Sequence, residues 1–215
     1  EFGVYLSAIP EIERVMKGED SYRFVKRIEP YLERASIAAI GLDGQEEGFP
    51  AYHHAPAFEY AGELGLKRTA HAGEACGANS VWEALYSLDL DRIDHGVRAA
   101  EDPLLVSLLA KRKIALTVCP LSNICLKVYP SLEQHSVKFL HENGIPIVIN
   151  SDDPPFFKGD LIDNYVAVYN AFNLDYRDLH TLARNSFIYS FAPKEIVDQG
   201  LEEVDLYFDA CGISI

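Results

Sequence analysis

The stretch KRTAHAGEACGANSVWEALYSLDLDRIDH, residues 67–95, decides the fold, because it holds one strand–helix–strand unit. Residues 67–71 and 92–95 are short strand-like runs, and residues 79–88 between them have the spacing of an amphipathic helix. A helix that connects two strands at this spacing is typical of parallel pairing through a crossover. The stretch therefore predicts one β/α repeat.

The same alternation extends over the whole chain. Further strand-like runs lie at 3–6, 37–42, 115–118 and 145–150, and helix-like segments lie near 21–34, 55–64, 102–112, 131–142, 160–173, 176–190 and 193–208. No linker or low-complexity tract interrupts it. We expect an α/β fold with six parallel strands in one domain over residues 1–215.

Composition restricts the class of protein. With 215 residues and 48% hydrophobic content, the chain can bury a large core. Its net charge of -14 argues against nucleic acid or an anionic membrane as a partner, because both would repel it. The 4 cysteines form no C-x-x-C, and no apolar run has the length of a membrane span. We therefore expect a cytoplasmic protein with reduced thiols.

Reactive side chains come at the ends of three predicted strands. His71, His95 and Asp152 each end or follow a strand-like run. In a (β/α)8 barrel the carboxyl ends of the strands form the rim that carries active sites, whereas the barrel core favours Val, Ile and Leu. Packing alone does not explain this distribution, so we expect a site at the rim.

The segment TAHAGE, residues 69–74, combines a metal-ligand type with a proton carrier. His71 is suited to zinc as a neutral imidazole, and Gly73 allows a sharp turn that presents Glu74 at the same place. A glutamate that is close to a metal without binding it can move protons between water and substrate. Taken alone, the same letters also fit a structural histidine followed by a solvated glutamate.

Two more segments offer similar chemistry. In RIDHG, residues 92–96, His95 can orient and deprotonate an attacking water, or it can cap the next loop as a structural histidine. In NSDDP, residues 150–154, adjacent carboxylates repel each other and usually have a cation or strong donor nearby. Asp152 can bind a metal while Asp153 accepts a hydrogen bond from substrate. The alternative for this pair is an Asx-turn or a helix N-cap.

The remaining polar segments favour structural roles. VCPLSN, residues 118–123, is interpreted as a rim loop that shapes the site, without a nucleophilic role for Cys119. The pair His53 and His54 lies in the longest loop, near 43–56, and is interpreted as surface or lid residues. The other histidines lie in helical patterns and are expected to be structural: His135, His141 and His180.

Together, these segments resemble the adenosine/adenine deaminase family. The matching pieces are TAHAGE (69–74), RIDHGVRAAED (92–102), LTVCPLSN (116–123), INSDDP (149–154) and RNSF (184–187), in order and across nearly the whole chain. The combination looks closest to the adenine deaminase subgroup, and related members act on modified adenines.

The resemblance implies a TIM (β/α)8-type barrel with one Zn²⁺ and a small purine as substrate, in purine salvage. It assigns the roles as follows: His71 and Asp152 as zinc ligands, Glu74 as the acid that protonates purine N1, His95 as the residue that activates the water, Asp153 as the partner of purine N7, and Gly44 as the residue whose backbone approaches the purine. Attack at C6 places charge on N1, so a protonated Glu74 is needed, and a water-poor pocket favours it.

One departure from the family pattern is the His-x-His motif of its first strand, which supplies two zinc ligands and has no counterpart in this sequence. We therefore expect the chain to begin near the third barrel strand, as a partial barrel of strands three to eight. The leading function is adenine deamination to hypoxanthine and ammonia. The alternatives are an adenosine or modified-adenine deaminase, another metal-dependent amidohydrolase, and a truncated or degenerate paralogue without activity.

Overall fold

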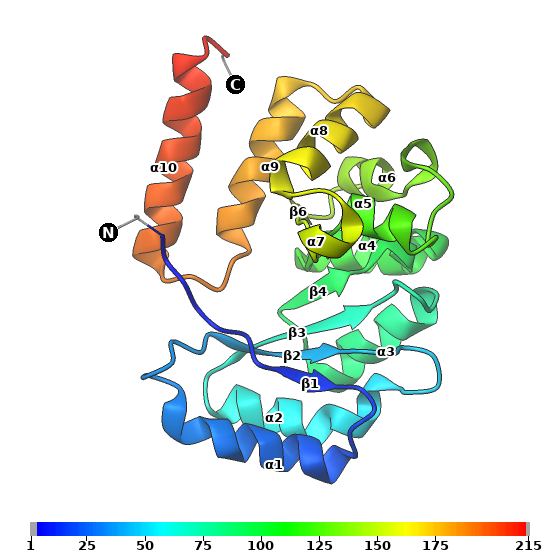
Figure 1. Ribbon diagram of the computed structural model, residues 1–215, viewed down its shortest axis with the longest axis vertical. Coiled ribbons are helices and arrows are strands. Elements are labelled where there is room, and N and C mark those ends of the chain that lie inside the picture. The colour runs from blue at the N-terminus through cyan, green and yellow to red at the C-terminus, as the bar shows by residue number, and fades with distance from the viewer. Residues whose placement is uncertain (1–3, 214–215) are drawn as a thin grey trace. The chain divides into compact units, whose positions relative to one another are not determined.

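The computed structural model describes residues 4–213, which form two compact units, one ending at Leu105 and the other beginning at Val106. In the first unit four strands alternate with helices (Figure 1). Their bounds, in order, are β1 (Glu11–Glu13), α1 (Gly18–Ile28), η1 (Glu29–Tyr31), β2 (Ala39–Asp43), η2 (Ala51–His54), α2 (Ala55–Glu63), β3 (Lys67–Ala72), α3 (Ala78–Leu88), β4 (Arg92–His95) and η3 (Val97–Glu101).

The strands of the first unit pair in parallel and in sequence order, β1 to β2, β2 to β3 and β3 to β4. The first four residues of β2 are buried, which is typical of a parallel strand covered on both faces. Helices α1 and α2 pack against each other, and α2 and α3 both pack on β3. In the β3–β4 register His71 lies opposite Asp94 and Ala72 opposite His95. The two predicted site histidines are therefore the penultimate residue of β3 and the last residue of the adjacent β4.

The second unit contains β5 and β6, which also pair in parallel. The bounds of its elements, together with α4 at the junction, are α4 (Pro103–Arg112), β5 (Ala115–Val118), α5 (Pro120–Cys125), η4 (Leu132–Gln134), α6 (Val137–Glu142), β6 (Ile147–Ile149), α7 (Pro154–Phe157), α8 (Leu161–Phe172), α9 (Tyr176–Ile188) and α10 (Lys194–Ala210). Both strands are fully buried, and α9 packs on β6. Helices α8 and α9 each begin with a capping box built from two aspartates.

The prediction of six parallel strands alternating with helices is confirmed for the described residues. The first strand was placed wrongly, because residues 4–6 of the predicted 3–6 run lie outside any strand and β1 begins at Glu11. Residue 3 lies outside the described part of the chain. The EIE sequence of β1 shows little apolar character, and only its central Ile12 is buried. Among the helices that the structure describes, none has both the length and the hydropathy needed to cross a membrane.

Candidate active site

The turn after β3 brings Glu74 back towards the strand that carries His71. Gly73 makes this turn with a φ of +72°, a conformation that side chains with a Cβ rarely adopt. The turn is also crowded, because a Cβ at Gly73 would lie 2.3 Å from Cγ2 of the buried Val81 on α3. The sequence TAHAGE therefore needs glycine at this position both for backbone conformation and for space.

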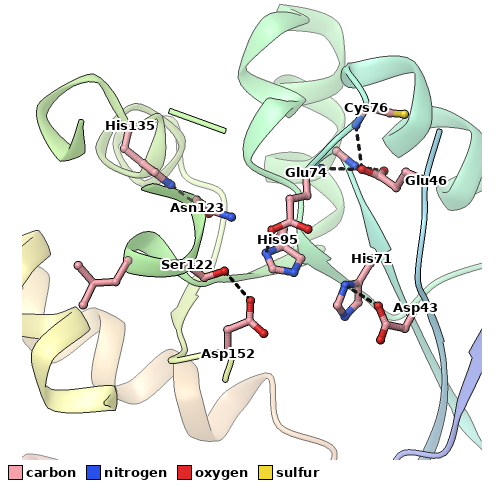
Figure 2. Close-up of polar contacts among 12 residues, drawn as sticks. Asp43, Glu46, His71, Glu74, Cys76, His95, Ser122, Asn123, His135 and Asp152 are labelled. Atoms are coloured by element: carbon pink, nitrogen blue, oxygen red, sulfur yellow. Dashed lines mark hydrogen bonds and ion pairs between the residues drawn. The ribbon is translucent and has the colours of Figure 1, made fainter. Parts of the chain in front are cut away.

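His71, Glu74 and His95 form one cluster at the ends of β3 and β4. Each of the three offers a ligand-type atom, and these atoms lie within 4.8 Å of one another. Nδ1 of His95 lies 3.2 Å from Oε1 of Glu74, and the rings of the two histidines meet edge-on with centroids 4.7 Å apart. Figure 2 shows Glu74 directly beside His95. The structure thus brings together three residues that were predicted from two separate segments.

His95 has an unusual backbone conformation. Its φ is +59°, and the next residue, Gly96, has a φ of +67°. A residue other than glycine in this left-handed region costs about 1–2 kcal/mol, and such strain is concentrated at functional sites. The side chain of His95 is only 4% exposed and that of Glu74 is 17% exposed. The pair is therefore largely screened from bulk water.

The imidazole ring of His71 is oriented by a carboxylate beside its Nδ1. Its Nδ1 lies 3.2 Å from Oδ1 of Asp43, the last residue of β2. A carboxylate on one imidazole nitrogen fixes the tautomer and leaves the other nitrogen, Nε2, as a lone-pair donor, which is the usual arrangement of a zinc-binding histidine. The donor set at His71 therefore fits the metal that the sequence predicts.

Glu46 was given no role from the sequence, yet it organises the turn that carries Glu74. Its buried carboxylate accepts hydrogen bonds from the backbone N–H groups of Gly73 (2.7 Å), Glu74 (3.1 Å) and Cys76 (2.9 Å), and from the hydroxyl of Ser80 (2.5 Å). Burial alone would raise the pKa of Glu46, but these hydrogen bonds and the charge of Arg14 hold it below its ordinary value. Glu46 is therefore ionised at neutral pH.

Arg14, one residue beyond β1, is a second buried charge that sequence reasoning missed. It is 3% exposed, and its guanidinium donates to the backbone oxygens of His71 (2.6 Å) and Phe49 (2.8 Å). Desolvation lowers the pKa of Arg14, while the charge of Glu46 acts in the opposite direction. Arg14 thus ties the end of β3 to the loop after β2. No spacing or motif distinguishes it from the surface arginines.

Asp152 and Asp153 belong to the second unit. Asp152 follows β6 with a φ of +58°, and Oδ2 of its carboxylate accepts a 2.7 Å hydrogen bond from the hydroxyl of Ser122. Asp153 is exposed and occupies the N-cap position of α7, but its side chain makes no capping hydrogen bond. Asp153 therefore has the N-cap position that the alternative interpretation predicts, but its carboxylate does not cap the helix and is available for another partner.

Gly44 follows β2 with a φ of +94° and is exposed, so its backbone can be approached from solvent. Its N–H donates to Oδ1 of Asp43. No described contact joins Gly44 directly to the cluster of His71, Glu74 and His95, although the same Oδ1 of Asp43 also lies 3.2 Å from Nδ1 of His71. Its substrate contact stays a prediction.

Two expectations from the sequence are wrong. His54 is not a surface or lid residue: it is fully buried, with Nδ1 2.7 Å from the Ser21 hydroxyl and Nε2 3.2 Å from the Arg14 backbone oxygen. The cause is the 3-10 helix η2, which forms within the expected loop, turns His54 inward and leaves His53 exposed. The VCPLSN segment is not a loop beyond Cys119, because α5 begins at Pro120, where proline is favoured in a first helical turn.

Comparison with known proteins finds matches over nearly the whole chain. The sequence profile of the adenosine deaminase family matches residues 1–207. The adenine deaminase of Cupriavidus taiwanensis is 44% identical over 197 residues, which cover 92% of this chain and 56% of that protein. This chain therefore spans little more than half the length of that relative.

Solved structures also match nearly the whole chain. The crystal structure of adenine deaminase from Arthrobacter aurescens superposes with a TM-score of 0.91 at 35% identity, covering 97% of this chain and 63% of that one. An amidohydrolase from Burkholderia ambifaria, solved with bound Zn, gives a TM-score of 0.86 at 25% identity, covering 100% and 61%. The expected partial TIM-type α/β fold is thereby confirmed, and the chain belongs to the adenosine deaminase family.

Proposed function

We propose that the protein carrying this chain is a zinc-dependent purine aminohydrolase that converts adenine to hypoxanthine and ammonia. The observation that carries the proposal is the cluster of His71, Glu74 and His95, in which a carboxyl and two imidazoles meet at the ends of adjacent parallel strands. This arrangement combines a metal-ligand type with two proton-transfer groups, as hydrolysis requires.

The metal would be held by His71 and Asp152, the two zinc ligands that the family resemblance places in this chain. His71 has the carboxylate-oriented imidazole described above, and Asp152 is oriented by Ser122. When bound, zinc lowers the pKa of a coordinated water enough to provide a nucleophile near neutral pH. The zinc in the Burkholderia ambifaria amidohydrolase supports this choice of metal.

The chain's own residues move the protons. His95 takes a proton from the attacking water, and Glu74 donates one to N1 of the purine as the water oxygen bonds to C6. The protonated His95 then gives its proton to the amino nitrogen, and the C6–N bond breaks to release ammonia. The hydroxyl hydrogen at C6 passes to Glu74 and restores its proton, so the atoms balance. The 3.2 Å separation between His95 Nδ1 and Glu74 Oε1 lets these groups exchange a proton between steps.

The proposal assigns two residues to the substrate. The carboxylate of Asp153 accepts a hydrogen bond at N7 of the purine, and the backbone at Gly44 lies against the base. Support comes from the uncapped carboxylate of Asp153 and from the exposed, positive-φ backbone of Gly44. We propose adenine as the base because the most similar relatives described above are adenine deaminases. The four cysteines form no disulfide among the described residues, which favours the cytoplasm as the location.

The test uses the intact purified protein. Bound metal is measured by mass spectrometry, and formation of hypoxanthine or inosine is followed by chromatography with adenine, adenosine and N6-substituted adenines as substrates. We expect bound zinc and the highest kcat/KM with adenine. Preference for adenosine or a substituted adenine would move the protein to the corresponding alternative, and zinc binding without any deamination would favour the degenerate paralogue.

A further inference from the structure

We infer that Glu46 is a positioning residue for Glu74: its carboxylate fixes the backbone turn that aims the acid at the substrate. The inference rests on the proposed function, because it assigns Glu46 a task within that reaction. Glu46 itself lies in the loop after β2 and touches none of the proposed reacting atoms. It acts through the backbone of residues 73–76.

The hydrogen bonds of Glu46 are concentrated on one short segment. Three of its four donors are backbone N–H groups of the turn after β3, those of Gly73, Glu74 and Cys76. The fourth donor is the hydroxyl of Ser80 on α3. Figure 2 shows two of these contacts, from the backbone of Glu74 and of Cys76, meeting at the carboxylate of Glu46. Because Glu74 donates its own N–H to Glu46, its Cα cannot rotate or shift without stretching a charge-assisted hydrogen bond.

A structural role alone does not explain why a charged carboxylate is buried at this position. A buried carboxylate loses its hydration, and Glu46 is only 8% exposed. An uncharged side chain or a shorter turn could close the same loop without burying a charge. What an ionised carboxylate adds is two oxygens that hold several N–H groups at once, and here those groups belong to the segment that carries the proposed acid.

The same residue couples two parts of the proposed substrate site. Gly44, whose backbone is proposed to lie against the purine, is only two residues before Glu46 in the chain. Glu46 therefore connects the loop after β2 to the turn after β3, so that the substrate contact and the acid keep a common geometry. Misplacement of a catalytic group by about 1 Å can cost about 100-fold in rate, so the demand on this connection is high.

The substitution Glu46→Gln tests the inference with little change of shape. The amide keeps one acceptor oxygen but replaces the other with an NH2 group that faces N–H donors. We expect kcat for adenine to fall about 100-fold while KM changes by less than about threefold, because positioning acts on the reacting geometry. Zinc content should stay at the wild-type level. Glu47→Gln is the matched control, since Glu47 is the exposed neighbour of Glu46 and should keep full activity.

A double-mutant cycle separates positioning from a general structural effect. If Glu46 acts through Glu74, the variant Glu46→Gln/Glu74→Gln should be within about twofold of Glu74→Gln alone, because the acid to be positioned is already gone. Losses that multiply in the double variant would overturn the inference, as would a Glu46→Gln enzyme with wild-type kcat. A Glu74→Gln enzyme with full activity would instead refute the proposed function.

Amide hydrogen exchange supplies a readout that does not depend on turnover. In Glu46→Gln the amides of residues 73–76 should exchange faster than in wild type, and in Glu47→Gln they should not change. Unchanged exchange in Glu46→Gln would overturn the inference even if activity fell. If Glu46→Gln does not fold, Ser80→Ala removes one of the four donors and should produce the same changes to a smaller extent, and wild-type exchange and kcat in Ser80→Ala would then refute it.

Discussion

Replacing Gly73 with alanine should destabilise the protein by an amount that the structure lets us divide into two parts. The φ of +72° imposes left-handed strain on alanine, which costs about 1–2 kcal/mol. The new Cβ would also lie 2.3 Å from Cγ2 of Val81, and such overpacking typically costs about 1–3 kcal/mol. The expected loss in the free energy of unfolding is therefore about 2–5 kcal/mol.

Gly65→Ala is the matched control for this experiment. Gly65 has a similar φ of +78°, but nothing lies within 4 Å of a Cβ built there. The free energy of unfolding of Gly65→Ala should therefore fall only by the cost of the backbone strain, about 1–2 kcal/mol. Urea unfolding of both variants gives the difference, and Val81→Ala in the Gly73→Ala background should recover part of it. Equal losses at Gly73 and Gly65 would refute the reasoning, because they would show that the contact with Val81 is relieved without cost.

Two further predictions concern stability. Burial lowers the pKa of His135 from 6.5 to about 4, so between these pH values the unfolded chain binds a proton that the folded chain does not. The free energy of unfolding should therefore fall by about 3 kcal/mol as the pH drops through this window. In His135→Gln, the free energy of unfolding measured with urea should depend less on pH in this window. An equally steep pH dependence in the variant would exclude His135 as the source. Asp160→Ala removes one half of the capping box of α8 with Asp163 and should cost about 1 kcal/mol, whereas no change in urea midpoint would mean that the cap contributes nothing.

The β/α alternation was predictable because buried parallel strands are short apolar runs separated by amphipathic helices. Runs 92–95 and 115–118 match β4 and β5 at both ends, and β3 differs by one residue. Strand β1 was missed because Glu11 and Glu13 leave its sequence without an apolar pattern. Short helices such as α5 and α7 were missed because four to six residues carry too little periodicity.

The candidate site was predictable where reactive side chains lie at, or just after, the end of a predicted strand. His71, Glu74 and His95 were found in this way, and the structure brings them together. Glu46 and Arg14 could not be found, because burial is what distinguishes them from other charged residues, and burial depends on tertiary packing. In sequence Glu46 is indistinguishable from the exposed Glu47.

The most direct test of the central claim is the turnover of Glu74→Gln in the intact protein, with zinc measured on the same sample. Glutamine can occupy the same space beside His95 and can form hydrogen bonds, but it cannot give a proton to purine N1. We predict that the variant keeps the zinc content of the wild type and loses about 100- to 10,000-fold in kcat for adenine. A zinc-loaded Glu74→Gln enzyme within a few-fold of wild-type kcat would contradict the assignment of Glu74 as the acid.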